Sequence, residues 1–169
     1  NLKTMKTIQE KFWSSKFAEE YAKRNYRSDK KLDSFYMKNL GVPRSKINKK
    51  FLDKLKLKNI LEVGCNTGNQ LTMLQHQGFK SLYGIELFDK VVEEAKNKTR
   101  GLNIIQGSAF DIPFKDSYFD LVFTSSLLIH ISPKDIRKAL SEIHRVSKKY
   151  IWGYEYYNDS HAGIDYRGN

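Results

Sequence analysis

The sequence has 169 residues, of which 40% are hydrophobic and 29% are charged, and its formal net charge at pH 7 is +11. This length and composition fit one globular domain and exclude a disordered chain, and no apolar stretch approaches the roughly 20 residues of a membrane span. The single cysteine, Cys65, excludes an intrachain disulfide and a thiolate-cluster zinc site, so we expect a soluble cytoplasmic protein with no metal and no membrane contact.

The first third of the chain holds all the excess positive charge. Residues 1–58 contain 17 lysines and arginines against 6 acidic residues, whereas residues 59–169 contain 13 of each. Such an imbalance is typical of an arm that binds nucleic acid or a membrane surface, of an electrostatic funnel for an anionic small substrate, or of a solvated lysine-rich helix. The charge pattern leaves these alternatives open.

Helical periodicity begins near the N-terminus. Large aromatic side chains and one arginine recur at steps of three and four residues, which predicts a single helix that carries them on neighbouring faces. These residues are Phe12, Trp13, Phe17, Tyr21 and Arg24.

A second basic helix is expected after a break at residues 41–43, which read Gly-Val-Pro. Ser45 is its expected cap. In residues 46–58 lysines alternate with Ile47 and further apolar residues, which predicts one amphipathic helix.

From residue 59 onward, strand and helix patterns alternate. Apolar runs predict five strands, at 59–63, 81–86, 102–106, 119–124 and 150–157. Helical stretches lie between them, at 69–77, 89–98 and 133–147, the last beginning at Pro133 after Ser132. This alternation predicts an α/β fold with a doubly wound, mostly parallel sheet. We expect residues 1–169 to form one domain, with a basic helical segment at 1–58 and a ligand-binding core at 59–169.

A glycine loop follows the first predicted strand, at the end of the sheet where such folds bind ligands. Gly64 and Gly68 allow backbone amides and a helix N-terminus to approach a ligand closely, and Glu86 ends the second strand, where a carboxylate can accept hydrogen bonds from ribose hydroxyls. The acidic side chain of Glu62, two residues before Gly64, does not suit a negatively charged pyrophosphate. It suits a ligand that is cationic or carries an amino group. S-adenosylmethionine has an ammonium, a sulfonium and a ribose, and no phosphate.

The segment LEVGCNTGNQL resembles the first motif of class I S-adenosylmethionine-dependent methyltransferases, (D/E)-x-G-x-G-x-G. Glu62, Gly64 and Gly68 match this motif, and Asn66 replaces the middle glycine. Asparagine adopts glycine's left-handed conformation more readily than most residues do. The segment YGIEL, which contains Glu86, resembles the ribose-binding motif of the same family.

Two further segments extend this resemblance over residues 59–151. QGSAFDIPF resembles the segment that lines the adenine pocket, with Ser108 where an acid is usual, and FDLVFTSSLLIHI resembles the strand end beneath the methionine part. The resemblance implies a Rossmann-like fold, S-adenosyl-L-methionine as cofactor, and two further strands after the five that are visible, which we expect to be missing here. It implies these cofactor-binding residues: Trp13, Tyr21, Arg24, Glu62, Gly64, Cys65, Asn66, Gly68, Glu86, Leu87, Ser108, Ala109, Phe110, Thr124 and Ser125.

A narrower resemblance involves both ends of the chain. Residues 12–25 with the segments EYYN (155–158) and YRG (166–168) resemble methyltransferases associated with pseudaminic acid biosynthesis. This resemblance implies a small anionic acceptor, a sugar or nucleotide-linked sugar. The implied substrate-binding residues are Tyr156, Tyr157, Asn158, Tyr166 and Arg167.

Methyl transfer from a sulfonium is an in-line displacement that orientation and desolvation can accelerate, sometimes with a base that takes the acceptor's proton. His130 and Glu155 are the candidate bases, because they follow the fourth strand and end the fifth. Trp13, Tyr21 and Arg24 are either core residues or a lid that packs rings over the sulfonium and pairs an arginine with the methionine carboxylate.

Two other functions stay open. A nucleic-acid (RNA) methyltransferase would use the basic segment as a phosphate-binding arm, although TSSLLIH replaces the Asn-Pro-Pro-aromatic motif of amino-methylating enzymes and no Pro-Cys pair is present. A cofactor-binding module without catalysis is the third alternative. The sequence does not fix the acceptor, the atom methylated or the oligomeric state.

Overall fold

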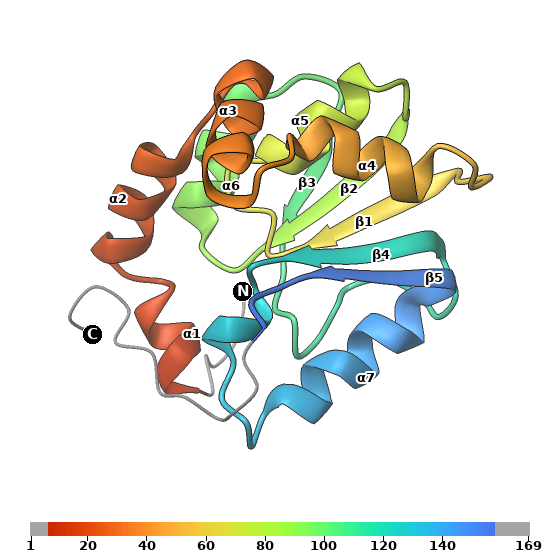
Figure 1. Ribbon diagram of the computed structural model, residues 1–169. Coiled ribbons are helices and arrows are strands. Elements are labelled where there is room, and N and C mark those ends of the chain that lie inside the picture. Colours follow the sequence, from red (N-terminus) through yellow and green to blue (C-terminus); the bar gives the residue numbers. More distant parts are fainter. Residues whose placement is uncertain (1–6, 158–169) are drawn as a thin grey trace.

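The protein, described by a computed structural model over residues 7–157, is built on a five-stranded parallel sheet of order β3-β2-β1-β4-β5 (Figure 1). The strands are β1 (Asn59–Val63), β2 (Ser81–Glu86), β3 (Asn103–Gln106), β4 (Phe119–Ser125) and β5 (Ser147–Tyr154). The predicted α/β class and parallel sheet are confirmed. No further strand follows β5 within the described range.

Helices cover both faces of the sheet, as a doubly wound fold requires (Figure 1). On one face α4 (Arg44–Leu52), α5 (Asn69–His76) and α6 (Asp89–Lys98) pack apolar side chains against Ile60 of β1. On the other face α7 (Ile136–Val146) packs Ile143 and Val146 against Leu61, the next residue of β1. Because successive strand residues point to opposite faces, one short strand serves both cores.

The N-terminal segment with the recurring aromatic residues forms two helices, where the periodicity predicts a single helix. α1 (Ile8–Phe12) ends at Trp13, and α2 (Lys16–Asn25) begins after Ser15. The Ser15 hydroxyl accepts a hydrogen bond from the Phe17 amide at 3.3 Å. This cap competes with helix continuation and therefore ends the predicted single helix. Figure 1 shows α1 and α2 standing across the carboxyl-terminal ends of the strands.

The second basic segment also differs from the prediction. Gly41, at φ 72°, ends α3 (Asp29–Leu40) as the break at 41–43 predicts, but the N-cap of α4 is Pro43 and Ser45 lies inside the helix. The Ser45 amide and hydroxyl both donate to the Asp33 carboxylate, at 2.8 and 2.6 Å, and tie α4 to α3. α4 ends at Leu52, because the chain must turn before it becomes extended at β1.

Two boundaries near the C-terminal end of the core are shifted. α7 begins at Ile136 rather than Pro133, because residues 133–135 form a turn in which the Ser132 carbonyl accepts from the amides of Asp135 and Ile136. β5 begins at Ser147, three residues before its predicted start. Among residues 7–157, no helix is both long and apolar enough to cross a bilayer.

Candidate functional site

Two adjoining cavities lie at the carboxyl-terminal ends of the strands. The first, of about 150 Å³, lies beneath α1 at the ends of β2 and β3, and the second, of about 310 Å³, lies beside α2 and α3 at the ends of β1 and β4. Both cavities share six lining residues: Tyr21, Gly64, Asn66, Ser125, Ser126 and His130. They therefore form one site with two halves.

The loop after β1 has the conformation that its glycines predict. Gly64 has φ 74°, and a Cβ there would lie 2.7 Å from Cδ1 of Leu127, so only a glycine leaves this approach open. Asn66 has φ 48°, in the left-handed region that we expected for a glycine substitute. Gly68, at φ 77°, lines neither cavity, because it packs beneath the loop toward Ile104.

Glu86 fastens this loop to β2. One carboxylate oxygen accepts from the amide of Leu87 at 2.8 Å and from that of Phe88 at 3.3 Å, and the other accepts from the amide of Asn66 at 3.0 Å. Burial raises the pKa of Glu86, and these three hydrogen bonds oppose that rise. Glu86 lines the first cavity, where its remaining lone pairs can accept from two ribose hydroxyls.

Glu62 lines the second cavity and is 98% buried. Its Oε2 has no hydrogen-bond partner among the residues that the structure describes. Burial raises the pKa of Glu62 well above its usual value, and the positive charge of Arg44 opposes this rise. A ligand ammonium beside Oε2 would supply the missing donor and stabilise the ionised form, so this half of the site fits the amino-acid end of S-adenosylmethionine.

The end of the first cavity near β3 is lined mainly by apolar side chains, with two polar side chains, Ser108 and Glu10, beside them. Leu87, Ala109 and Phe110 line it, beside Ser108. The Ser108 hydroxyl donates to Oε1 of Glu10 at 2.8 Å across 98 positions of the chain. Sequence reasoning missed Glu10, because nothing local to α1 marks it as a partner of the β3 loop.

Aromatic side chains from α1 and α2 cover both halves. Trp13 and Tyr21 line the first cavity, with ring centroids 5.1 Å apart, and Tyr21 also lines the second. Trp13 packs on His130 at a centroid distance of 4.5 Å. Trp13 and Tyr21 therefore lie over the site, whereas Phe12 and Phe17 line neither cavity.

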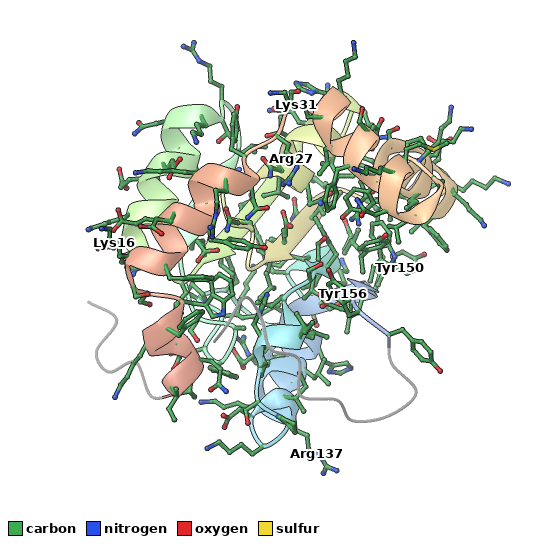
Figure 2. The ribbon with its side chains drawn as sticks, turned by 60° about the vertical axis from the view of Figure 1, so that its left-hand side comes forward. Lys16, Arg27, Lys31, Arg137, Tyr150 and Tyr156 are labelled. Atoms are coloured by element: carbon green, nitrogen blue, oxygen red, sulfur yellow. The ribbon has the colours of Figure 1, made fainter. Side chains whose placement is uncertain are left out.

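Arg24 does not take part in this cover. It lies about 200° around α2 from the fully buried Ala22, at about 100° per residue, and is exposed. Arg27, three residues later on the connection to α3, lines the second cavity instead. Its guanidinium donates to the carbonyl and side-chain oxygens of Asn25, at 3.0 and 3.1 Å, and lies 4.6 Å from the ring centroid of Phe35. Figure 2 shows Arg27 near the middle of the molecule, whereas Lys16 and Arg137 lie at its periphery.

His130 lies in a 3-10 turn (Leu128–His130) where the two cavities meet. Burial lowers the pKa of His130 to about 4. The imidazole is therefore neutral at pH 7, which is the form that accepts a proton, and its low pKa makes it a weak base.

Glu155 hydrogen-bonds to the backbone of the 3-10 turn that contains His130, and it lines neither cavity. Its two carboxylate oxygens accept from the amides of Leu127 and Leu128, at 3.1 and 3.0 Å. An anion is favoured at the start of a helical turn, where backbone amides lack partners. Glu155 therefore caps this turn, and its assignment as a base stays a prediction.

The other predicted residues divide between the cavities and their surroundings. Cys65 and Tyr156 line the second cavity, and burial raises the pKa of the Cys65 thiol well above its usual value. Thr124 is buried within β4 and Tyr157 is largely exposed, and neither lines a cavity. Asn158, Tyr166 and Arg167 lie outside the described residues.

Replacing Glu155 by alanine should destabilise the fold by about 1–3 kcal/mol, because two amides of the turn lose their acceptor. Urea denaturation followed by circular dichroism measures this loss. Glu93, an exposed acid on α6, is the matched control, and its replacement by alanine should change the free energy of unfolding by about 0.5 kcal/mol at most. Equal stability of both variants would show that Glu155 does not hold the turn.

Comparison with known proteins gives one family. A family model described as a methyltransferase domain matches residues 61–150. An uncharacterized methyltransferase of Synechocystis is 33% identical over 89 residues, which cover 53% of this chain and 42% of that protein. The chain thus spans less than half the length of this curated relative.

Solved structures show the same fold. A protein of Methanococcus maripaludis, 20% identical, superposes with a TM-score of 0.62 over 90% of this chain and 68% of its own. A SAM-dependent methyltransferase of Thermotoga maritima, 26% identical, gives a TM-score of 0.51 over 62% of this chain and 45% of its own.

Proposed function

Since the chain belongs to the family of methyltransferase domains, we propose that it transfers a methyl group from S-adenosylmethionine to a small anionic acceptor, a sugar or nucleotide-linked sugar, in the cytoplasm. S-adenosylmethionine is the cofactor of this family, as the sequence predicts. The observation that carries the proposal is the position of His130 where two adjoining cavities meet, one lined by Glu86 and the other by Glu62.

Each half of the site has residues that suit one part of the cofactor. Glu86 would hold the ribose, and the unpartnered Oε2 of Glu62 would accept from the ammonium. Arg27 is the one lysine or arginine among the described residues that line either cavity, so it would pair with the methionine carboxylate.

The reaction itself needs little from the protein beyond orientation and one proton acceptor. When bound, S-adenosylmethionine supplies an electrophilic methyl group, to which the acceptor's lone pair bonds while the carbon–sulfur bond breaks and leaves its electron pair on sulfur. His130 takes the proton that the acceptor atom loses, and Trp13 and Tyr21 exclude water from the reacting groups.

The anionic character of the acceptor is supported by the exposed lysines of α3 and α4. α3 lines the second cavity with Leu32, Phe35 and Tyr36. α3 and the following α4 carry these exposed lysines: Lys30, Lys31, Lys38, Lys46, Lys49 and Lys50. Such a field raises the local concentration of a negatively charged substrate, and salt screens it. The sugar is supported by the narrower resemblance of the terminal segments, which stays a prediction.

Replacing Arg27 by glutamine should weaken binding of S-adenosylhomocysteine by about 10- to 100-fold, as expected for the loss of a charge-assisted hydrogen bond. Isothermal titration calorimetry measures this change. The same variant should bind 5′-methylthioadenosine, which lacks the amino-acid part, as tightly as the unaltered chain does. Arg24→Gln is the matched control on the exposed face of α2 and should leave both affinities unchanged.

Methyl transfer is tested with the unaltered chain by mass spectrometry of sugar acids, nucleotide sugars and RNA incubated with S-adenosylmethionine. A mass gain of one methyl group on a sugar acceptor, lost with His130→Ala, supports the proposal. A gain on RNA alone, with steeply salt-dependent binding, would replace the sugar by nucleic acid. Cofactor binding with no methylated acceptor would support a binding module without catalysis.

A further inference from the structure

We infer that Glu10 of α1 recognises the amino group of the adenine base and so determines which nucleoside the site accepts; this inference rests on the proposed function. The segment after β3 carries Ser108 where the resembled family usually has an acid. The structure brings a carboxylate to that serine from the other end of the chain, at 2.8 Å.

The order of the strands fixes where the base must lie. Glu86 ends β2, which is flanked by β3 on one side and by β1 on the other. If the ribose lies on Glu86, its C5′ substituent points toward Glu62 at the end of β1, and its base points the opposite way, toward Ser108 after β3. The apolar side chains of Leu87, Ala109 and Phe110 line this end of the first cavity and suit the faces of a purine.

Glu10 is the carboxylate that lines that end of the cavity. Among the described residues that line the first cavity, the acids are Glu10 and Glu86, and Glu86 is committed to the loop amides and the ribose. Glu10 is 9% exposed. Its Oε1 accepts from Ser108, and its Oε2 accepts from the Thr7 amide at 3.1 Å and from the Thr7 hydroxyl at 3.4 Å. A carboxylate oxygen can accept from more than one donor, so Oε1 can accept from an exocyclic amino group as well as from Ser108.

The hydrogen-bonding chemistry of Glu10 and Ser108 predicts which purine base the site prefers. An ionised carboxylate accepts hydrogen bonds and cannot donate them, so it favours the 6-amino group of adenine. It disfavours a 6-oxo purine, whose oxygen would face the carboxylate without a proton between them. Ser108 orients Glu10 and completes the contact that an acid at position 108 would make alone.

Calorimetry with S-adenosylhomocysteine and S-inosylhomocysteine, which differ at the 6-position, tests this assignment without turnover. The unaltered chain should prefer the adenine ligand by ~10-fold or more, and Glu10→Gln should reduce the preference to within ~3-fold, because an amide can donate as well as accept. Adding Ser108→Asp to Glu10→Gln should restore the preference. Glu20→Gln removes an exposed acid of α2 and should leave the preference as it is.

The outcomes separate this inference from the proposed function. If the unaltered chain binds neither ligand, the proposed function fails. If it binds S-adenosylhomocysteine and Glu10→Gln lowers both affinities by the same factor, Glu10 merely holds α1 in place and the inference is overturned.

A ligand change on the unaltered chain tests the same contact if Glu10→Gln does not fold. The N6,N6-dimethyl analogue of S-adenosylhomocysteine has no donor at the 6-position and should bind ~10-fold or more weakly. Equal binding of this analogue would overturn the inference.

Discussion

Gly64→Ala is expected to weaken binding of S-adenosylhomocysteine by ~10-fold or more while the chain still folds. At φ 74° an alanine is strained by roughly 1–2 kcal/mol, and its Cβ would lie 2.7 Å from Cδ1 of Leu127. Leu127 itself lines the first cavity, so relief of this clash moves either the loop or Leu127 from its place around the ligand. A 10-fold loss of affinity corresponds to ~1.4 kcal/mol, which is the scale of this local strain.

A second glycine separates backbone strain from this local clash. Gly41 ends α3 at φ 72°, almost the same angle, and a Cβ there would meet no atom within 4 Å. Gly41→Ala should lower the melting temperature and leave the affinity for S-adenosylhomocysteine unchanged. If both alanine variants bind equally well, Gly64 does not line the cofactor site.

Glu86→Ala should produce the other large effect, a loss of ~100-fold or more in affinity for S-adenosylhomocysteine. The substitution removes the acceptor of two ribose hydroxyls, each worth roughly 1.5–3 kcal/mol with a charged partner before water compensates. It also leaves the amides of Asn66, Leu87 and Phe88 without the acceptor that holds the loop on β2.

The two causes are distinguished by changing the ligand rather than the loop. The 2′,3′-dideoxy analogue of S-adenosylhomocysteine should bind the unaltered chain weakly. If Glu86 holds the ribose, Glu86→Gln should weaken S-adenosylhomocysteine more than it weakens the dideoxy analogue. An equal loss for both ligands would assign Glu86 to the loop alone.

The sequence predicted the sheet well because its strands are short apolar runs between strong turn signals. β1 and β2 have the predicted bounds, and so does α6. The first turn of α6 contains the acidic Asp89, and its last turn contains lysines, as is typical of the two ends of a helix. The predicted helix boundaries were wrong where a local hydrogen bond interrupts the helical periodicity. One example is Ser15, which caps a new helix within the segment of recurring aromatic residues.

The site was predicted in part, and the division has a physical reason. Glu62, Gly64 and Glu86 lie at the carboxyl ends of two consecutive strands, so spacing alone places them at one edge of the sheet. Glu10 and Arg27 reach that edge from helices whose docking depends on tertiary packing, which no local pattern encodes. Glu155, at the end of β5, has a position suited both to a base and to a cap, and only the structure shows that its carboxylate accepts from backbone amides.

The five-residue length of α1 has a consequence for the turnover cycle. Isolated helices shorter than about 12–15 residues are marginal in water, so α1 depends on its contacts with Ser108 and with the ring of His130 through Trp13. A bound nucleoside would add contacts to this same element and slow its departure from the site. Loss of spent S-adenosylhomocysteine would then require α1 to open, the kind of step that limits turnover in many enzymes.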